Sequence, residues 1–299
     1  MSSAPPTDSH RRALITGGGG QLGQELRDTV PTGWTALSCT SAEFDVTRPG
    51  QVGEVLERVR PAVVINAAAY TGVDAAEQEP ARAHAVNAAG AANVAAASRV
   101  VGARLIQVST DYVFGGALGR PYLPDDRTEP LGVYGRTKLE GEREVMRIAA
   151  DTSVILRTAW LYSGRGRNFV LTMLRLFRER EEVGVVCDQV GTPTWCRSAA
   201  EAIWAAAQRP DVSGIHHWTD EGMASWYELA LAVQEEALAL GLLQRPVPIR
   251  PLRSDQYPTP ARRPSYSVLD ASATEAALGL RRRPWRVTLH LMLQELVRA

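Results

Sequence analysis

The stretch ALITGGGGQLGQEL, residues 13–26, decides the fold of this chain. It begins with an apolar run typical of a buried strand, continues through a glycine turn, and ends in residues of helical composition. Glycines at 17, 20 and 23 match a turn in which one adopts a positive φ, one lets the backbone approach a phosphate, and one packs helix against strand. This order predicts a dinucleotide site on Gly17, Gly20 and Gly23, with the diphosphate at the helix N-terminus.

The alternation of apolar and helical segments continues through the first half of the chain. Apolar runs occupy residues 13–16, 35–39, 62–66, 104–109 and 153–157, and helical stretches occupy 21–30, 51–58, 81–101 and 134–150. Short apolar runs separated by helices are typical of a parallel sheet covered on both faces. The sequence therefore predicts an α/β fold with a Rossmann-type doubly wound parallel sheet, whose ligands bind at the carboxyl ends of the strands.

The second half has a different character, because tryptophan and proline become more frequent after residue 160 and strands no longer separate the helices. An apolar stripe predicts a helix over residues 168–179, and Ser225 and Glu228 resemble a capping box that opens a helix ending near residue 240. The proline-rich residues 245–264 are expected to be extended or looped. We expect a disordered tail at 1–11, a Rossmann domain that binds NAD(P) at 12–165, to which the chain returns around 190–220, and a smaller C-terminal substrate-binding region at 166–299.

The composition excludes several classes of partner. The 299 residues carry 33 Lys and Arg against 33 Asp and Glu, and a net charge of zero offers no positive face for nucleic acid or an anionic membrane surface. No apolar run approaches the roughly 20 residues that span a bilayer, and the polar N-terminus has no signal-peptide core. Three scattered cysteines indicate free thiols in a reducing compartment, so we expect a cytoplasmic protein. We expect it to be a monomer or a homodimer. No short segment gathers carboxylates or cysteines, so no metal is expected.

The end of the second predicted strand bears on the choice of coenzyme. Residues 37–41 read LSCTS, where NAD-preferring Rossmann folds carry an acid that accepts the ribose hydroxyls and NADP enzymes usually carry a basic residue. Because the carboxylate that would repel a 2′-phosphate is missing, Ser38 and its neighbours favour NADPH, while NADH stays possible. Asp45 and Val46 are candidates for the adenine contact, with a solvated loop acid as the alternative for Asp45.

A tyrosine and a lysine four residues apart form the candidate proton donor. Tyr134 and Lys138 lie in YGRTK, and on a helix this spacing puts both on one face. A nearby ammonium favours the phenolate and is expected to lower the pKa of Tyr134, so that the phenol can protonate an oxygen as hydride reaches the attached carbon. At the end of the fourth predicted strand Thr110 is expected to polarise a substrate carbonyl, with Ser109 as the alternative.

These segments resemble the extended short-chain dehydrogenase/reductase superfamily. The resemblance rests on TGGGGQLG at 16–23, NAAAYTGVD at 66–74, STDYVF at 109–114 and YGRTK at 134–138. Four later segments make the chain similar to the dTDP-4-dehydrorhamnose reductase family: RTAWLY at 157–162, NF at 168–169, DQVGTPT at 188–194 and YPTPARRP at 257–264. The eight motifs occur in the family's order from about residue 12 to the C-terminus.

The resemblance implies an activity and roles for further residues. Thr110, Tyr134 and Lys138 would be the catalytic triad of an oxidoreductase that reduces the C4 ketone of dTDP-4-dehydro-6-deoxy-L-mannose to dTDP-L-rhamnose, and Tyr134 and Lys138 would also contact the coenzyme. Other residues implied along the coenzyme are Gly17, Gly20, Gln21, Leu22, Ala67, Ala68 and Ala69. Those implied at the dTDP-sugar are Tyr112, Trp160, Asn168 and Arg263.

Other interpretations stay open at this point. Trp160 could be core packing, Arg263 a solvated loop charge, and Asn168 a helix N-cap, which is compatible with ligand contact. The substrate could be another dTDP-4-keto-6-deoxy sugar, from a dihydrostreptose or antibiotic pathway. A regulatory subunit that binds NADP without turnover, like the β subunit of methionine adenosyltransferase, shares the scaffold, but the presence of all three triad residues favours an enzyme.

Overall fold

The computed structural model describes residues 11–298, and a six-stranded sheet in the order β10-β5-β4-β3-β1-β2 forms its centre. All neighbouring strands in this sheet are parallel. The strands are β1 (Arg11–Thr16), β2 (Trp34–Cys39), β3 (Val63–Asn66), β4 (Arg104–Thr110), β5 (Ser153–Thr158) and β10 (Gly214–His217). The predicted α/β fold is confirmed, and the five predicted apolar runs correspond to the first five strands.

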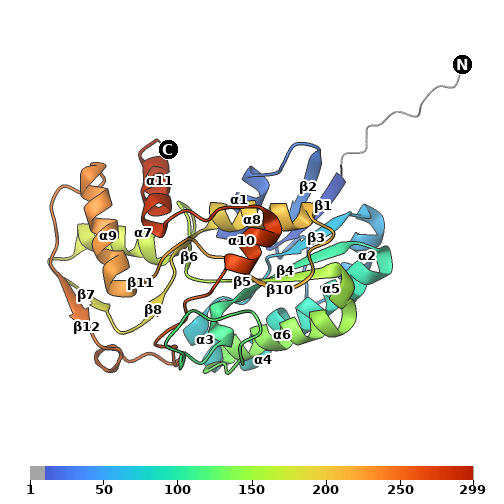
Figure 1. Cartoon of the computed structure of the whole chain (residues 1–299), viewed down its shortest axis with the longest axis horizontal. Helices are drawn as coiled ribbons and strands as arrows, with labels where there is room; N and C mark the ends of the chain where they lie inside the picture. The colour runs from blue at the N-terminus through green and yellow to red at the C-terminus, as the bar shows by residue number, and fades with distance from the viewer. Residues whose placement is uncertain (1–10, 299) are drawn as a thin grey trace, which may run out of the picture.

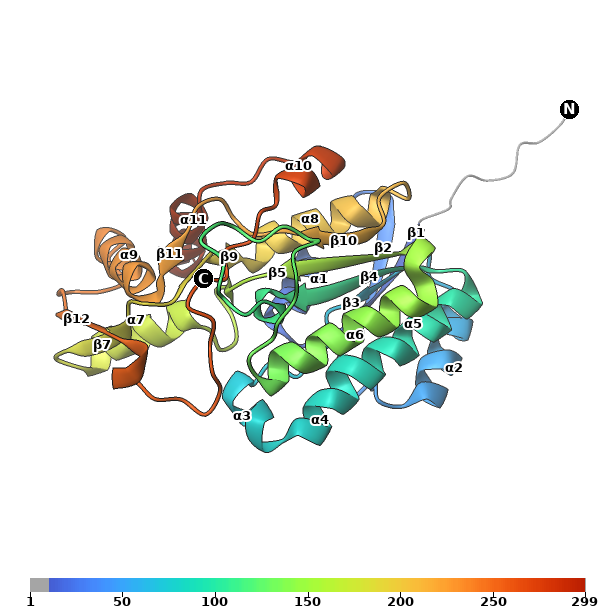
Figure 2. The same ribbon diagram turned by 60° about the horizontal axis from the view of Figure 1, so that its bottom comes forward.

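Two layers of helices cover the sheet, as Figure 2 shows. Ile15 and Ile65 pack on one face against α1 (Gln21–Asp28) and α8 (Cys196–Gln208). Leu14 and Val64 point to the opposite face, because successive strand residues alternate, and there they pack in the core beneath the second helical layer. That layer consists of α2 (Pro49–Val59), α5 (Gly90–Val101) and α6 (Val133–Ala149). The inner strand β3 is buried at every position because helices cover both faces of the sheet, whereas the edge strand β2 also carries exposed residues.

The helix predicted over 81–101 is interrupted in the structure. It consists of α4 (Pro80–His84), a π-helical turn (Ala85–Ala89) and α5, and the short α3 (Val73–Gln78) precedes it. The side chain of Asn87, in the π-helical turn, donates to the carbonyl oxygen of Tyr70 at 3.2 Å and accepts from its N–H at 2.9 Å. This turn therefore ties the helix to the loop that follows β3.

Most of the remaining elements form a smaller unit, on the left in Figure 1. Its helices α7 (Phe169–Glu179), α9 (Trp226–Ala239) and α11 (Trp285–Arg298) share an apolar core that includes Phe177, Val233 and Leu289. Three two-stranded sheets complete it: β7 (Val183–Val186) with β12 (Ile249–Leu252), β8 (Val190–Gly191) with β11 (Ala224–Ser225), and β6 (Leu161–Tyr162) with β9 (Thr194–Trp195). The chain returns to the central sheet through α8 and β10, and α10 (Ser272–Leu278) packs beside them.

Local signals in the sequence set several of these boundaries. Asn168 is the N-cap of α7, and its side chain accepts from the N–H of Leu171 at 3.0 Å. Ser225 and Glu228 form the capping box that opens α9. Of the tail predicted at 1–11, residues 1–10 lie outside the described residues, whereas Arg11 is the first residue of β1. Within residues 11–298 we find no helix with the length and apolar character needed to cross a bilayer.

Candidate active site

A cavity of about 920 Å³ opens at the carboxyl ends of the sheet strands, where β1 has β2 on one side and β3 on the other. Such a reversal of strand order is where open α/β sheets bind their ligands. The sequence-predicted residues that line it are Gly17, Gly20, Gln21, Leu22, Gly23, Asp45, Val46, Ala67, Ala68, Ala69, Thr110, Tyr134, Lys138 and Trp160. Those that the structure does not bring into the lining are Ser38, Tyr112, Asn168 and Arg263.

The glycine turn after β1 has no room for side chains at two of its positions. Gly17 has a φ of +70°, and a Cβ there would lie 2.7 Å from the backbone of Ala67 and Ala68. A Cβ on Gly23 would lie 2.3 Å from the carbonyl oxygen of Gly17, so this glycine lets α1 pack against the turn. Gly20 is the N-cap of α1 and lines the cavity. The turn is therefore a backbone cradle at a helix N-terminus, which fits the diphosphate of a dinucleotide.

A chain of buried polar side chains holds the loop after β3 against this turn. The hydroxyl of Thr16 donates to Asn66 Oδ1 at 2.5 Å, and Asn66 Nδ2 donates to Gln107 Oε1 at 2.7 Å. The N–H of Ala68 donates back to the Thr16 hydroxyl at 3.2 Å. These bonds cross from β1 through β3 to β4, so the residues 67–69 that border the coenzyme side of the cavity are fixed by three strands.

The structure moves the polar lining near β2 along the chain from where the sequence placed it. Thr40 and Ser41 line the cavity. Ser38 points instead toward the glycine turn, where its Oγ would lie 2.2 Å from a Cβ on Gly18. Asp45 accepts from the N–H and hydroxyl of Thr47, at 3.0 and 2.7 Å, and these bonds hold its pKa below the usual range. Hydroxyls thus border this end of the cavity, as expected, but they belong to Thr40 and Ser41.

The candidate triad meets where the end of β4 faces α6. Thr110 is the last residue of β4, and Tyr134 and Lys138 are one turn apart near the start of α6. The Thr110 hydroxyl lies beside the Tyr134 phenol and donates to Asp111 Oδ1 at 3.0 Å, and Lys138 Nζ donates to the carbonyl oxygen of Val108 at 2.6 Å. Ser109, the alternative to Thr110, donates instead to the buried Glu142. The geometry favours Thr110 as the hydroxyl that acts together with Tyr134.

The expected effect of Lys138 on Tyr134 is wrong for this structure. Burial raises the pKa of Tyr134 to about 12, although the neighbouring Thr110 hydroxyl opposes the shift. Burial also lowers the pKa of Lys138 to about 8. Desolvation penalises both charged forms, and the charge of Asp111 adds to the rise in the pKa of Tyr134. Tyr134 is therefore a protonated phenol at neutral pH, which suits a proton donor.

Three of the predicted substrate residues form a second layer around the cavity. The rings of Tyr112 and Tyr134 contact edge to face, with centroids 5.8 Å apart. Arg263 lies near the Tyr112 hydroxyl, and its Nη2 donates to Asp74 Oδ2 at 2.7 Å. Asn168 Nδ2 donates to Gln21 Oε1 at 3.3 Å, so the cap of α7 touches the start of α1. Tyr112 and Asn168 each contact a residue of the cavity lining, and Arg263 lies next to Tyr112.

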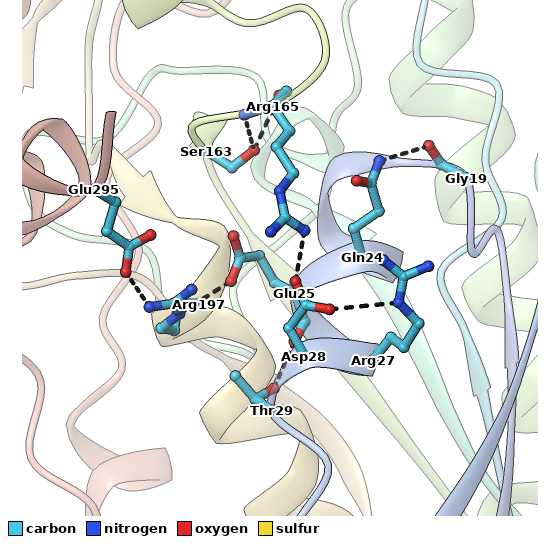
Figure 3. Close-up of polar contacts among 10 residues, drawn as sticks. All are labelled: Gly19, Gln24, Glu25, Arg27, Asp28, Thr29, Ser163, Arg165, Arg197 and Glu295. Atoms are coloured by element: carbon cyan, nitrogen blue, oxygen red, sulfur yellow. Dashed lines mark hydrogen bonds and ion pairs between the residues drawn. The ribbon is translucent and has the colours of Figure 1, made fainter. Parts of the chain in front are cut away.

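Ion pairs fasten the smaller unit to α1, as Figure 3 shows. Arg197 of α8 lies between two carboxylates, donating to Glu25 Oε2 at 3.0 Å and pairing on its other side with Glu295 of α11. Arg165 donates to Asp28 Oδ2 at 2.5 Å. Glu25 is only 3% exposed, so its partner also compensates a buried charge. These ion pairs hold α1, the helix that follows the glycine turn, in a fixed position relative to the smaller unit.

Several residues in the cavity lining were given no role on the basis of the sequence. Arg82 from α4 and Arg167 from the loop before α7 both line the cavity, as do Asp111 and Thr158. Burial raises the pKa of Asp111 to about 7. Asp111 could have been found, because it directly follows Thr110 at a strand end. The two arginines are surface-like in sequence, and only the packing of distant segments brings them to the cavity.

Comparison with known proteins agrees with this geometry. Residues 11–298 match the model of the RmlD substrate binding domain. The chain belongs to the RmlD family. The dTDP-4-dehydrorhamnose reductase of Escherichia coli K12 is 41% identical over 291 residues, which cover 95% of this chain and 97% of that protein. The protein of the same name from Streptomyces griseus is 44% identical over 283 residues, 93% of this chain and 91% of its own.

Solved structures place this RmlD-family chain with the same enzymes. The crystal structure of dTDP-4-dehydrorhamnose reductase from Bacillus anthracis in complex with NADP has a TM-score of 0.90 and 35% identity, covering 95% of this chain and 99% of that one. UDP-glucose 4-epimerase from Thermus thermophilus, in complex with NAD, has a TM-score of 0.78 at 20% identity and so shares the fold alone. The predicted membership of the family is confirmed.

Proposed function

We propose that this protein is an NADPH-dependent reductase that converts dTDP-4-dehydro-6-deoxy-L-mannose to dTDP-L-rhamnose, with Tyr134 as the proton donor. The observation that carries the proposal is the meeting of Thr110, Tyr134 and Lys138 in the cavity that the glycine turn also lines. A subunit that only binds a dinucleotide needs no proton donor at that position. The similarity to dTDP-4-dehydrorhamnose reductases over nearly the whole chain supports the choice of substrate.

The residues on the coenzyme side fit a dinucleotide phosphate. Gly17, Gly20 and Gln21 would hold its diphosphate at the N-terminus of α1, and Thr40 and Ser41 would face the adenosine ribose. Neither of these two residues is a carboxylate that would repel a 2′-phosphate, which supports NADPH. When bound, NADPH supplies the hydride.

The chain's own groups act on the substrate oxygen. Tyr134 carries its proton at neutral pH and donates it to the oxygen at C4 as the alkoxide develops there. Thr110 lies beside the Tyr134 phenol, and its place at the end of β4 lets it polarise the ketone. The buried ammonium of Lys138, anchored on the carbonyl of Val108, favours negative charge near the phenol after the proton has left.

One assay tests reaction, coenzyme and sugar together. Purified protein is mixed with dTDP-4-dehydro-6-deoxy-L-mannose and either NADPH or NADH, oxidation of the coenzyme is followed by absorbance, and the product is identified by NMR. We expect turnover with formation of dTDP-L-rhamnose and a preference for NADPH. If the protein turns over only a different 4-keto sugar, that sugar replaces dTDP-4-dehydro-6-deoxy-L-mannose as the proposed substrate. If it binds NADPH but turns over no such sugar, the protein is a regulatory subunit.

A further inference from the structure

Trp160 is held in an unusual conformation at the edge of the cavity. It lines the cavity and has a φ of +47°, a left-handed conformation that only Arg60 shares among the non-glycine residues of the described chain. A bulky residue adopts this conformation only where its surroundings impose it. The contacts of Trp160 therefore identify which residues determine the position of its indole.

Trp226 covers one face of that indole. The two rings are stacked, with centroids 3.4 Å apart and planes only 4° apart. Trp226 is the first residue of α9, directly after the N-cap Ser225, so the capping box with Glu228 fixes its backbone. Phe169 of α7 packs against Trp226 at 4.7 Å between centroids. Trp226 is absent from the cavity lining, so its influence on a ligand must pass through Trp160.

Gly191 meets the same indole from another strand. A Cβ on Gly191 would lie 2.5 Å from Cε2 of Trp160 and 2.6 Å from its Nε1, so no larger residue fits while the ring stays in place. Gly191 ends β8, which pairs with β11 in the register Gly191 opposite Ala224 and Val190 opposite Ser225. This pairing puts Gly191 and Trp226 next to one another around Trp160.

We propose that Trp226 and Gly191 are positioning residues that lock the Trp160 indole as a rigid wall for the nucleotide sugar. The proposal rests on the proposed function, because it assumes that the sugar occupies the part of the cavity that Trp160 borders. A ring that is already in place when the ligand arrives loses no rotamer freedom on binding, so the lock contributes to affinity for the sugar and not for the coenzyme. Thr194 adds a hydrogen bond from its N–H to the Trp160 carbonyl at 3.2 Å, which also holds this backbone.

The test compares variants that free or displace the ring with one that only removes a nearby indole. Trp226→Ala removes the stacking partner, Gly191→Ala displaces the ring, and Trp226→Phe keeps an aromatic partner. The matched control is Trp285→Ala, because Trp285 is buried in the same apolar core but its ring lies against Gly222 instead of Trp160. Each variant is measured for KM and kcat with the nucleotide sugar, for Kd with NADPH, and for melting temperature.

We expect Trp226→Ala and Gly191→Ala to raise KM for the sugar by about threefold to tenfold, the range that the loss of one aromatic pair gives. The Kd for NADPH should stay within about twofold, and Trp226→Phe should restore most of the affinity for the sugar. Trp285→Ala should lower the melting temperature and leave KM unchanged. In circular dichroism, the exciton signal of the stacked indoles should disappear in both Trp226 variants, whatever their activity.

Two results would overturn the inference while leaving the proposed function intact. One is an unchanged KM in a folded Trp226→Ala variant of an active enzyme. The other is an equal rise in KM in Trp285→Ala, which would show that any loss of core packing has the same effect. A wild-type protein that neither binds nor turns over the nucleotide sugar would overturn the proposed function, and the inference with it.

Discussion

Removing the phenolic hydroxyl of Tyr134 is the most direct perturbation of the proposed reaction. Tyr134→Phe keeps the ring and its edge-to-face contact with Tyr112, at 5.8 Å between centroids, and deletes only the hydroxyl that lies beside Thr110. General acid catalysis is worth about 10² to 10⁴ in rate, which corresponds to about 3 to 5 kcal/mol of barrier. We expect kcat to fall by that factor, with Kd for NADPH within about twofold of wild type.

The pH dependence of the wild type is predicted here from the pKa values of Tyr134 and Lys138, the two groups proposed to act on the proton. With the pKa of Tyr134 raised to about 12, the donor stays protonated through the whole working range, and its ionisation causes no loss of activity below about pH 11. The pKa of Lys138 is lowered to about 8, so the ammonium loses its charge as the pH rises through 8. Since the reaction uses the cation, kcat/KM should be constant below about pH 7 and should fall with a slope approaching tenfold per pH unit above 8.

The assay is the absorbance of NADPH with saturating coenzyme, measured from about pH 6 to pH 10 for the wild type, Tyr134→Phe and Tyr112→Phe. Tyr112→Phe is the matched control, because it removes the neighbouring hydroxyl, which lies near Arg263, and it should change KM more than kcat. A Tyr134→Phe variant within about threefold of the wild-type kcat would remove the phenol from the mechanism. A profile that stays flat to about pH 10 would contradict the role given to the charge of Lys138.

Three further predictions concern the coenzyme and the core. Gly20→Val places a branched side chain where the diphosphate meets α1, so calorimetry should show NADPH binding weakened by at least about a hundredfold, and unchanged affinity would mean the turn is only structural. Ser41→Asp puts a negative charge in the lining near β2, so the affinity for NADPH should fall by about tenfold to a hundredfold while the affinity for NADH is unchanged. Ser38→Asp should mainly destabilise the glycine turn. If the ratio of the two dissociation constants does not change in Ser41→Asp, the adenosine ribose lies elsewhere. Arg157→Met leaves Glu142 without its guanidinium partner at 2.7 Å, and both side chains are only 2% exposed. Urea unfolding should therefore show that the free energy of unfolding falls by about 3 to 5 kcal/mol. A fall below about 1 kcal/mol would mean that water or a rearranged partner compensates the carboxylate.

Local sequence determined the sheet, the glycine turn and the caps. The five apolar runs became strands because a parallel sheet covered on both faces buries mostly apolar residues, which leaves a signal in the sequence itself. The capping box at Ser225 and the cap at Asn168 are equally local, since each is a side chain bonding to backbone three residues away. The same holds for the spacing that puts Tyr134 and Lys138 on one face of α6.

Only the tertiary structure decided which residues meet and what charge they carry. Ser38 and Thr40 are two residues apart, yet the packing of Gly18 against Ser38 leaves Thr40 and not Ser38 in the lining. The pKa of Tyr134 rises where the sequence led us to expect a fall, because desolvation depends on every segment that buries the phenol, and most of these are remote in the chain. Trp226 joins Trp160 across 66 positions through the pairing of β8 with β11, and no periodicity reports a contact of that kind. Local chemistry repeats at fixed spacing and can be read from the sequence, whereas burial and long-range contact are properties of the folded chain as a whole.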